Sequence, residues 1–328
     1  MTDIWLPLFG GFLFLIFGGE LLVRGAVRVA ERLGVSPLVI GLTLVGFGTS
    51  TPELVTSVRA ALAGSPGIAY GNIVGSNIAN ILLIVGISAL LTPMAVTSGA
   101  LKRDGGVMLA VALVFAVLAA AFPITRGVGL AFVLGLALYI FYAFRTETAS
   151  AAAEHGAVYE KAMALEGVDP AIMPLDKTKP NLWLSLATAL AGLVLVIVGG
   201  GFLVDGAVAL ARSKEISETV IGLTIVAVGT SMPELVTSVV AAIRRQSDVA
   251  FGNIIGSNIY NILGIGGVTA LIAPTDVPQQ IIRFDIPVMI LGSLALIAVA
   301  HTGLKISRRE GSGLLVGYVA YLWWLWPT

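Results

Sequence analysis

The chain has 328 residues, of which 57% are hydrophobic and only 12% are charged, and its mean hydropathy is +0.97. A soluble domain of this length carries about twice that share of charged residues, so the composition predicts an integral membrane protein. Nineteen Lys and Arg balance nineteen Asp and Glu, which argues against nucleic-acid binding, and the lack of cysteine excludes disulfides and thiolate metal sites.

Apolar runs of membrane-spanning length recur along the whole chain. The expected transmembrane helices are 4–30, 37–62, 67–92, 104–123, 127–145, 182–211, 219–243, 249–273, 284–303 and 311–327. Between the fifth and the sixth lies a segment rich in Glu and Lys, which we expect to be aqueous with a short helix near 151–165. The predicted organisation is a five-helix unit at 1–145, a cytoplasmic linker at 146–181 and a second five-helix unit at 182–328.

One segment of the first unit recurs in the second. Residues 47–53 read FGTSTPE and 228–234 read VGTSMPE, while 71–82 read GNIVGSNIANIL and 252–263 read GNIIGSNIYNIL. The offset is constant (234 − 53 = 181), and an ungapped alignment of 39–86 with 220–267 is identical at 31 of 48 positions. Because five crossings are an odd number, the second copy enters from the opposite side of the membrane. The predicted fold is therefore an all-α integral membrane protein with ten transmembrane helices in two inverted five-helix repeats.

The distribution of basic residues orients the chain in the membrane. If the N-terminus is outside, fourteen of the nineteen Lys and Arg residues fall on the side of the 146–181 linker. Positive residues accumulate on the cytoplasmic side of membrane proteins. We therefore expect a multi-pass protein of the plasma (inner) membrane with both termini outside.

Each copy of the repeat places a proline and a glutamate in the middle of a transmembrane helix. Pro52 and Pro233 lack an amide hydrogen, so we expect the second and seventh helices to break there and to free backbone carbonyls. Such irregular backbone persists in a membrane only where it lines a protected cavity. Glu53 and Glu234 follow the breaks directly. With the freed carbonyls and nearby hydroxyls they form an all-oxygen site that suits a hard cation, Ca²⁺ or Na⁺.

The third and eighth helices carry further polar and small residues. Ser76 and Asn80 lie four residues apart and share a helix face, and Ser257 and Asn261 repeat this spacing. Glycine pairs at the same spacing are expected to let backbones approach closely: Gly71, Gly75, Gly252 and Gly256. We therefore expect the second, third, seventh and eighth helices to cross near the bilayer centre.

The paired GTS-x-PE and GN-x-x-GSN-x-x-N segments resemble the two alpha-repeats of the cation/calcium antiporter superfamily, in particular its prokaryotic sodium/calcium exchangers. The resemblance covers nearly the whole chain. It implies a sodium/calcium antiporter working by alternating access, not an enzyme, with transported Ca²⁺ and Na⁺ and no prosthetic group. By motif position, the implied calcium ligands are Glu53, Glu234 and the carbonyls of Thr49 and Thr230. The implied sodium ligands add Ser50, Ser76, Ser231 and Ser257, with Asn80 and Asn261 lining the central site.

Other couplings and another class of protein remain as alternatives. Asn261 stands where several potassium-dependent relatives carry Asp, and no Glu follows the Gly-Asn pair of the third helix as it does in proton-coupled members. Both differences favour sodium over potassium or protons as the driving ion. A cation channel could use the same oxygens, but inverted duplication around helix breaks favours a carrier. The expected partners are the two ions and the lipid bilayer, with no nucleic acid.

Overall fold

The computed structural model describes residues 2–96, 99, 101–163, 181–213 and 227–325. The first unit contains α1 (Thr2–Leu33), α2 (Pro37–Ile40), η1 (Gly41–Val45), α3 (Gly46–Thr49), α4 (Thr51–Leu62), α5 (Pro66–Ile78), η2 (Ala79–Ile84), α6 (Val85–Leu91), β1 (Met94–Ala95), η3 (Leu101–Gly105), α8 (Gly106–Ala121) and α9 (Arg126–Met163). The second contains α10 (Leu182–Ser213), α12 (Ala227–Thr230), α13 (Met232–Ile243), α14 (Ser247–Tyr260), η6 (Asn261–Gly266), α15 (Gly267–Ile272), η7 (Ile281–Asp285), α16 (Ile286–His301), β2 (Lys305–Ile306) and α17 (Arg308–Leu325). The segments labelled η are π-helical turns.

The helical membrane fold that the sequence predicts is confirmed. Within the described ranges, seven helices are long and apolar enough to cross a membrane, and the count is eight when the bent pair Pro37–Thr49 and Thr51–Leu62 is taken as one broken span. Helices α13 and α17 stand at the places of the seventh and tenth predicted spans. Residues 214–226, which include the start of the predicted seventh span, lie outside the described residues.

Helix α9 differs from its predicted extent. It continues without interruption from Arg126 to Met163, so the first part of the expected linker is the end of this long helix rather than a separate short one. The sequence explains the continuation, because Ala, Glu, Lys and Met dominate 151–163 and favour helix, and no proline interrupts them. The remainder of the predicted linker, 164–180, lies outside the described residues.

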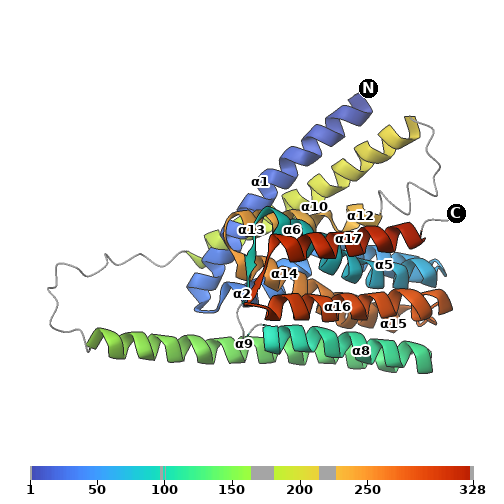
Figure 1. Cartoon of the computed structure of the whole chain (residues 1–328). Helices are drawn as coiled ribbons and strands as arrows, with labels where there is room; N and C mark the ends of the chain where they lie inside the picture. The colour runs from blue at the N-terminus through green and yellow to red at the C-terminus, as the bar shows by residue number, and fades with distance from the viewer. Residues whose placement is uncertain (1, 97–98, 100, 164–180, 214–226, 326–328) are drawn as a thin grey trace.

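Helices α1 and α10 lie side by side and tilt away from the rest of the bundle (Figure 1). Their contact is very close, because a Cβ on Gly192 of α10 would lie 2.3 Å from the backbone nitrogen of Leu22 in α1. Glu20 of α1 pairs with Arg24 one turn later and with Arg244 at the end of α13, whose Nη2 lies 2.5 Å from its carboxylate. The glycine contact thus holds α1 against α10, and the Glu20–Arg244 ion pair attaches this pair of helices to α13.

Two short strand contacts repeat the inverted symmetry. Strands β1 and β2 pair antiparallel, with Met94 opposite Ile306, and an isolated bridge joins Ile124 to Thr275. The repeat offset relates Thr275 to Met94 (275 − 94 = 181) and Lys305 to Ile124 (305 − 124 = 181). Met94 precedes α8 and Ile124 follows it, so the two contacts lie at opposite ends of this helix. The bundle is therefore closed at both ends by equivalent pairs of loops.

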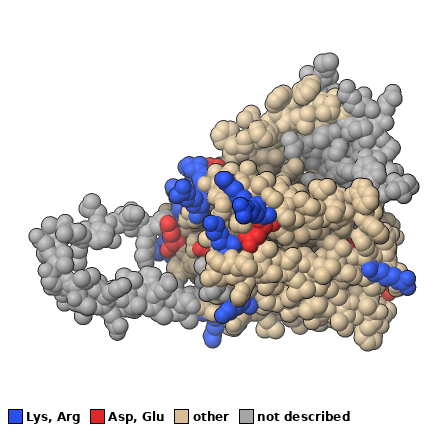
Figure 2. Space-filling view, viewed as in Figure 1, with Lys and Arg blue, Asp and Glu red and all other residues tan. Residues whose placement is uncertain are grey.

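The surface fits a lipid environment. On the face shown in Figure 2, most charged side chains gather toward one end of the bundle, a small group lies at the opposite end, and the surface between them is uncharged. Large apolar side chains are exposed on the outer helices, including Leu138 of α9 at 69% and Val316 of α17 at 68%. Both ends of the described chain, where α1 begins and α17 stops, lie at the same end of the bundle, opposite the end of α9 (Figure 1).

Candidate functional site

The two expected helix breaks have the same backbone geometry. Helix α3 ends at Thr49 and α4 begins at Thr51, and the residue between them, Ser50, has φ −83° and ψ 10°. Its counterpart Ser231, between α12 and α13, has φ −89° and ψ 10°. The helix axis bends by 45° at the first break. Each break lies two residues before the proline, because Pro fits the first turn of the new helix but cannot continue the old one.

The two carboxylates are buried and each is bonded to the opposite repeat. Glu53 and Glu234 are both only 1% exposed. Ser50 Oγ donates to Glu234 Oε1 at 2.7 Å, and Ser231 Oγ donates to Glu53 Oε1 at 3.1 Å. The serine at each helix break thus holds the glutamate that follows the other break. These two hydrogen bonds hold the broken helices against each other at the centre of the bundle.

Four oxygens of these repeat-equivalent residues remain unpaired. Among the described residues, Glu53 Oε2, Glu234 Oε2, Asn80 Oδ1 and Asn261 Oδ1 are buried without a hydrogen-bond partner. The asparagines lie in the π-helical turns η2 and η6, which pack against α13 and α4, the helices that carry the glutamates. Buried oxygens without donors are costly, and a cation bound among them would remove that cost.

Three of the other predicted ligands lie near the helix breaks. Ser76 Oγ lies 3.4 Å from Ser231 Oγ, and Ser257 Oγ donates to the carbonyl of Gly46 at 3.2 Å. Thr49 is fully buried, with its hydroxyl 3.2 Å from Asn253 Oδ1. In the described part of the chain, no three His, Cys, Asp or Glu side chains gather into a metal cluster. The candidate oxygens are therefore two carboxylates and several neutral groups, a combination that suits a hard cation.

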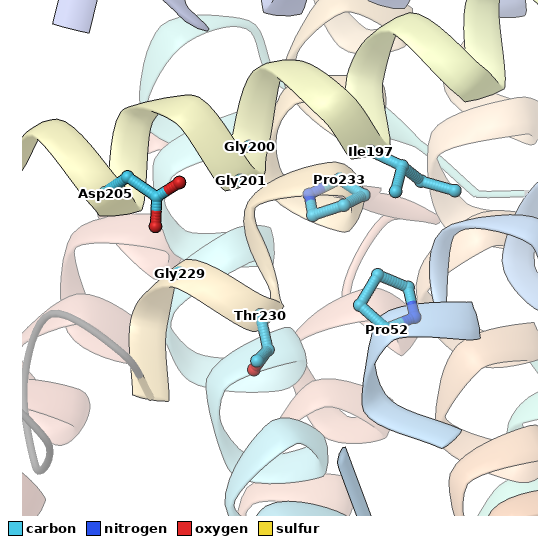
Figure 3. A pocket seen from close by; sticks show the side chains of 8 residues that line it. All are labelled: Pro52, Ile197, Gly200, Gly201, Asp205, Gly229, Thr230 and Pro233. Carbon is cyan, nitrogen blue, oxygen red and sulfur yellow. The ribbon is translucent and has the colours of Figure 1, made fainter. Parts of the chain in front are cut away.

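A cavity of about 290 Å³ reaches the second helix break (Figure 3). Its lining consists of Pro52, Ile197, Gly200, Gly201, Asp205, Gly229, Thr230 and Pro233. Thr230, the last residue of α12, is thus placed at the cavity rather than deep in the core. Asp205 is next to Gly206, which packs against Leu8 near the start of α1, so the cavity lies toward the end of the bundle where α1 begins.

Two asparagines outside the predicted ligand set hold the backbone at the site. Asn72 Nδ2 donates to the carbonyl of Glu53 at 3.1 Å and to Ser57 Oγ at 2.9 Å. Its counterpart Asn253 donates to the carbonyl of Glu234 at 3.4 Å and to Ser238 Oγ at 2.8 Å. The same bonds recur at the same offset, so each amide holds the backbone of one glutamate. The recurring Gly-Asn pair in the repeat was the signal for this role.

The glycine pairs serve close packing where their partners are described. A Cβ on Gly252 would lie 2.5 Å from the carbonyl oxygen of Leu38, and one on Gly256 would lie 2.4 Å from that of Leu42. The predicted close approach is confirmed for this pair. The repeat offset places the equivalent partners of the first-repeat pair at 219 and 223, outside the described residues.

Two inverted repeats meet at broken helices, and each repeat hydrogen-bonds the buried carboxylate of the other. This arrangement is typical of a membrane carrier of cations. A profile of the family described as "Sodium/calcium exchanger protein" matches residues 4–145 and 184–326. The chain is 37% identical to "Sodium/calcium exchanger MaX1" of Methanosarcina acetivorans, over 98% of each chain, and 35% identical to "Inner membrane protein YrbG" of Escherichia coli, over 97% of this chain and 96% of the relative. A solved structure of the sodium-calcium exchanger NCX_Mj, soaked without Na⁺ and Ca²⁺, superposes with a TM-score of 0.83 at 31% identity over 99% of this chain and 100% of the other. The protein belongs to the sodium/calcium exchanger family.

Proposed function

We propose that this protein exchanges Na⁺ for Ca²⁺ across the membrane by alternating access at the site between the two helix breaks. The observation that carries the proposal is the pair of carboxylates, each bonded through one oxygen to a serine of the opposite repeat while the other oxygen is unpaired. Membership of the sodium/calcium exchanger family supports the choice of ions.

In this proposal calcium is bound by Glu53 and Glu234 together with the carbonyls of Thr49 and Thr230. Sodium ions use overlapping carboxylates and add the hydroxyls of Ser50, Ser76, Ser231 and Ser257, while Asn80 and Asn261 supply amide oxygens. Ser50 and Ser231 donate their hydrogens to the carboxylates, so their lone pairs are free to face a cation. The two ions compete because they need the same charged oxygens.

The buried charges explain why transport would be coupled. When no ion is bound, two buried carboxylates lie in the same site with only serine donors to compensate them, and burying such charges is expensive. Bound ions neutralise them and allow the loaded site to pass through an occluded state. An empty carrier would cross that state rarely, so one ion would have to return for the other to leave.

The cavity at the second break is the route by which ions would reach the site from one side. Thr230, one of the proposed ligands, lines this cavity. Asp205 also lines it and adds an acidic group that attracts cations. We place this opening on the outer side of the plasma membrane, with both termini outside and the segment after α9 in the cytoplasm, as the positive-inside bias predicts. The site would then lie where the two five-helix units, 1–145 and 182–328, meet.

Sodium-gradient-driven uptake of ⁴⁵Ca²⁺ into proteoliposomes tests the proposal. We expect saturable uptake that depends on an outward sodium gradient and is abolished when sodium is equal on both sides. A proton- or potassium-coupled antiporter would instead follow a pH or potassium gradient without sodium. Calcium flux without any counter-ion would indicate a channel and contradict the exchange mechanism.

A further inference from the structure

Beyond the proposed ligands, a chain of three buried side chains runs outward from Asn80. Asn80 Nδ2 lies 3.5 Å from Asn258 Oδ1, to which it donates, and Asn258 Nδ2 donates to the thioether sulfur of Met108 at 3.6 Å. All three side chains are at most 2% exposed. The chain begins in η2, crosses to α14 of the second repeat and ends on α8 of the first.

The second repeat contains the matching chain. Asn261 Nδ2 donates to Asn77 Oδ1 at 3.2 Å, and Asn77 Nδ2 donates to Met289 Sδ at 3.5 Å. Each member is separated from its counterpart in the first chain by the repeat offset, as in 289 − 108 = 181. The recurrence of the sulfur contacts along with the amide contacts sets these two methionines apart from side chains that only fill space.

The chemistry of the thioether gives the chain a direction. A methionine sulfur accepts hydrogen bonds weakly and donates none, so the part of a neighbouring amide that faces it is the NH₂ group. Asn258 must then turn Oδ1 toward Asn80, and Asn80 must turn Nδ2 toward Asn258. The oxygen of Asn80 is left pointing away from this contact, buried and unpaired. The same sequence of constraints leaves Asn261 Oδ1 unpaired in the other repeat.

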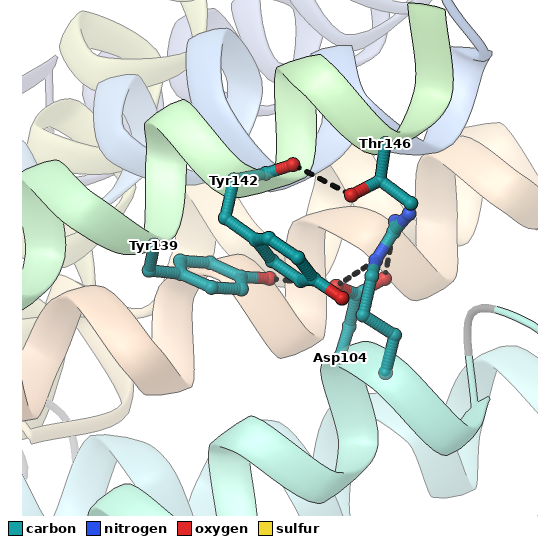
Figure 4. Close-up of polar contacts among 5 residues, drawn as sticks. Asp104, Tyr139, Tyr142 and Thr146 are labelled. Carbon is teal, nitrogen blue, oxygen red and sulfur yellow. Dashed lines mark hydrogen bonds and ion pairs between the residues drawn. The ribbon is translucent and has the colours of Figure 1, made fainter. Parts of the chain in front are cut away.

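Each methionine lies one helical turn after a buried aspartate that is held in place. Tyr139 Oη donates to Asp104 Oδ1 at 3.1 Å (Figure 4). The guanidinium of Arg103 donates to both oxygens of the same carboxylate at 2.8 Å. In the second repeat, Tyr321 Oη donates to Asp285 Oδ1 at 2.9 Å. These bonds tie the start of α8 to α9 and of α16 to α17, which fixes the sulfurs relative to the amides.

We propose that Met108 and Met289 are positioning residues that keep the Asn80 and Asn261 amide oxygens turned toward the transported ions. This inference rests on the proposed ion site. Leucine has nearly the same volume but no acceptor, so replacing either methionine removes the preference that orders the amides. If the amides rotated by 180°, Asn80 or Asn261 would present its NH₂ group to the cation instead of its oxygen. The affinity for sodium should fall more than the affinity for calcium, because calcium relies on the two carboxylates.

The test is equilibrium binding of ⁴⁵Ca²⁺ to the purified full-length protein, displaced by sodium. For Met108→Leu we expect the half-displacing sodium concentration to rise about threefold to tenfold, the equivalent of one neutral hydrogen bond, with a smaller change in calcium affinity. Met94→Leu is the matched control: Met94 is fully buried in β1, makes no hydrogen bond to an amide side chain among the described residues, and should leave the curve unchanged. Thermal unfolding checks that the variants are folded.

A double-mutant cycle separates orientation from general packing. In an Asn80→Ala background the oriented oxygen is absent, so Met108→Leu should cause no further shift. A Met108→Leu shift no larger than that of Met94→Leu, or one that is fully additive with Asn80→Ala, would overturn the inference. If Asn80→Ala does not fold, the cycle of Met289→Leu with Asn261→Ala gives the same answer. Wild-type protein whose calcium is not displaced by sodium would refute the proposed site itself, a result distinct from failure of the positioning role.

Discussion

Glu53→Gln isolates the contribution of one charge to calcium binding. Ser231 Oγ donates to Glu53 Oε1 at 3.1 Å, so the amide oxygen of the new side chain can retain that bond. The amide nitrogen then occupies the place of Oε2, which is buried and has no partner among the described residues. The substitution therefore keeps the shape of the site, removes one negative charge and turns N–H donors toward the cation.

The expected loss is large for a divalent ion. Two unit charges about 4 Å apart attract by about 4 kcal/mol at an effective dielectric constant of about 20, so a carboxylate and Ca²⁺ attract by about 8 kcal/mol. Part of this is offset, because the variant no longer pays to bury a carboxylate. If half remains, the loss of about 4 kcal/mol weakens calcium binding about a thousandfold. Sodium, with half the charge, should lose roughly half as much free energy per ion by the same relation.

The assay is equilibrium ⁴⁵Ca²⁺ binding together with sodium-driven uptake in proteoliposomes. We expect no measurable uptake by Glu53→Gln or by its counterpart Glu234→Gln. Glu31→Gln, the same chemical change on an exposed part of α1, should behave as wild type. Calcium exchange at the wild-type rate in either site variant would refute the reasoning, because a site that needs both charges cannot lose one without consequence.

Three further predictions test the neutral ligands, the topology and the access route. Ser76→Ala and Ser257→Ala should each weaken sodium more than calcium in a competition titration, and unchanged sodium curves in both would remove these residues from the ligand set. Single cysteines near Gly64 (at the exposed Ala63) and near Ser247, in a chain without native cysteine, should react with an impermeant maleimide from opposite sides of the membrane; labelling of both from one side would contradict inverted repeats. Gly201→Cys should be tolerated, because a Cβ there meets nothing within 4 Å among the described residues, and its modification by a bulky thiol reagent should stop uptake, whereas full activity after complete modification would exclude the cavity as the ion route.

Much of the site was predictable because its signals are local or repeated in the sequence. A proline inside an apolar span breaks the helix wherever that span lies, and the breaks at Ser50 and Ser231 follow from this rule. A glutamate in the middle of a span is costly, and Glu53 and Glu234 could be chosen because each directly follows a break and recurs at the repeat offset. The constant offset then predicted that the structure would be duplicated and inverted.

The pairing between the copies was decided only by tertiary structure. Nothing in the repeat says that Ser50 binds Glu234 rather than the nearer Glu53, a contact across 184 residues of sequence. The contacts of Asn258 with Met108 and of Asn77 with Met289 span 150 and 212 residues, and buried methionines in apolar helices give no sign of a polar role. The recurrence of Asp-x-x-Val-Met at 104–108 and 285–289 was a weak signal for them. Sequence periodicity determines which face of a helix is polar, whereas the choice of partner depends on how the two inverted halves interlock, because only packing sets the distances between residues far apart in the chain.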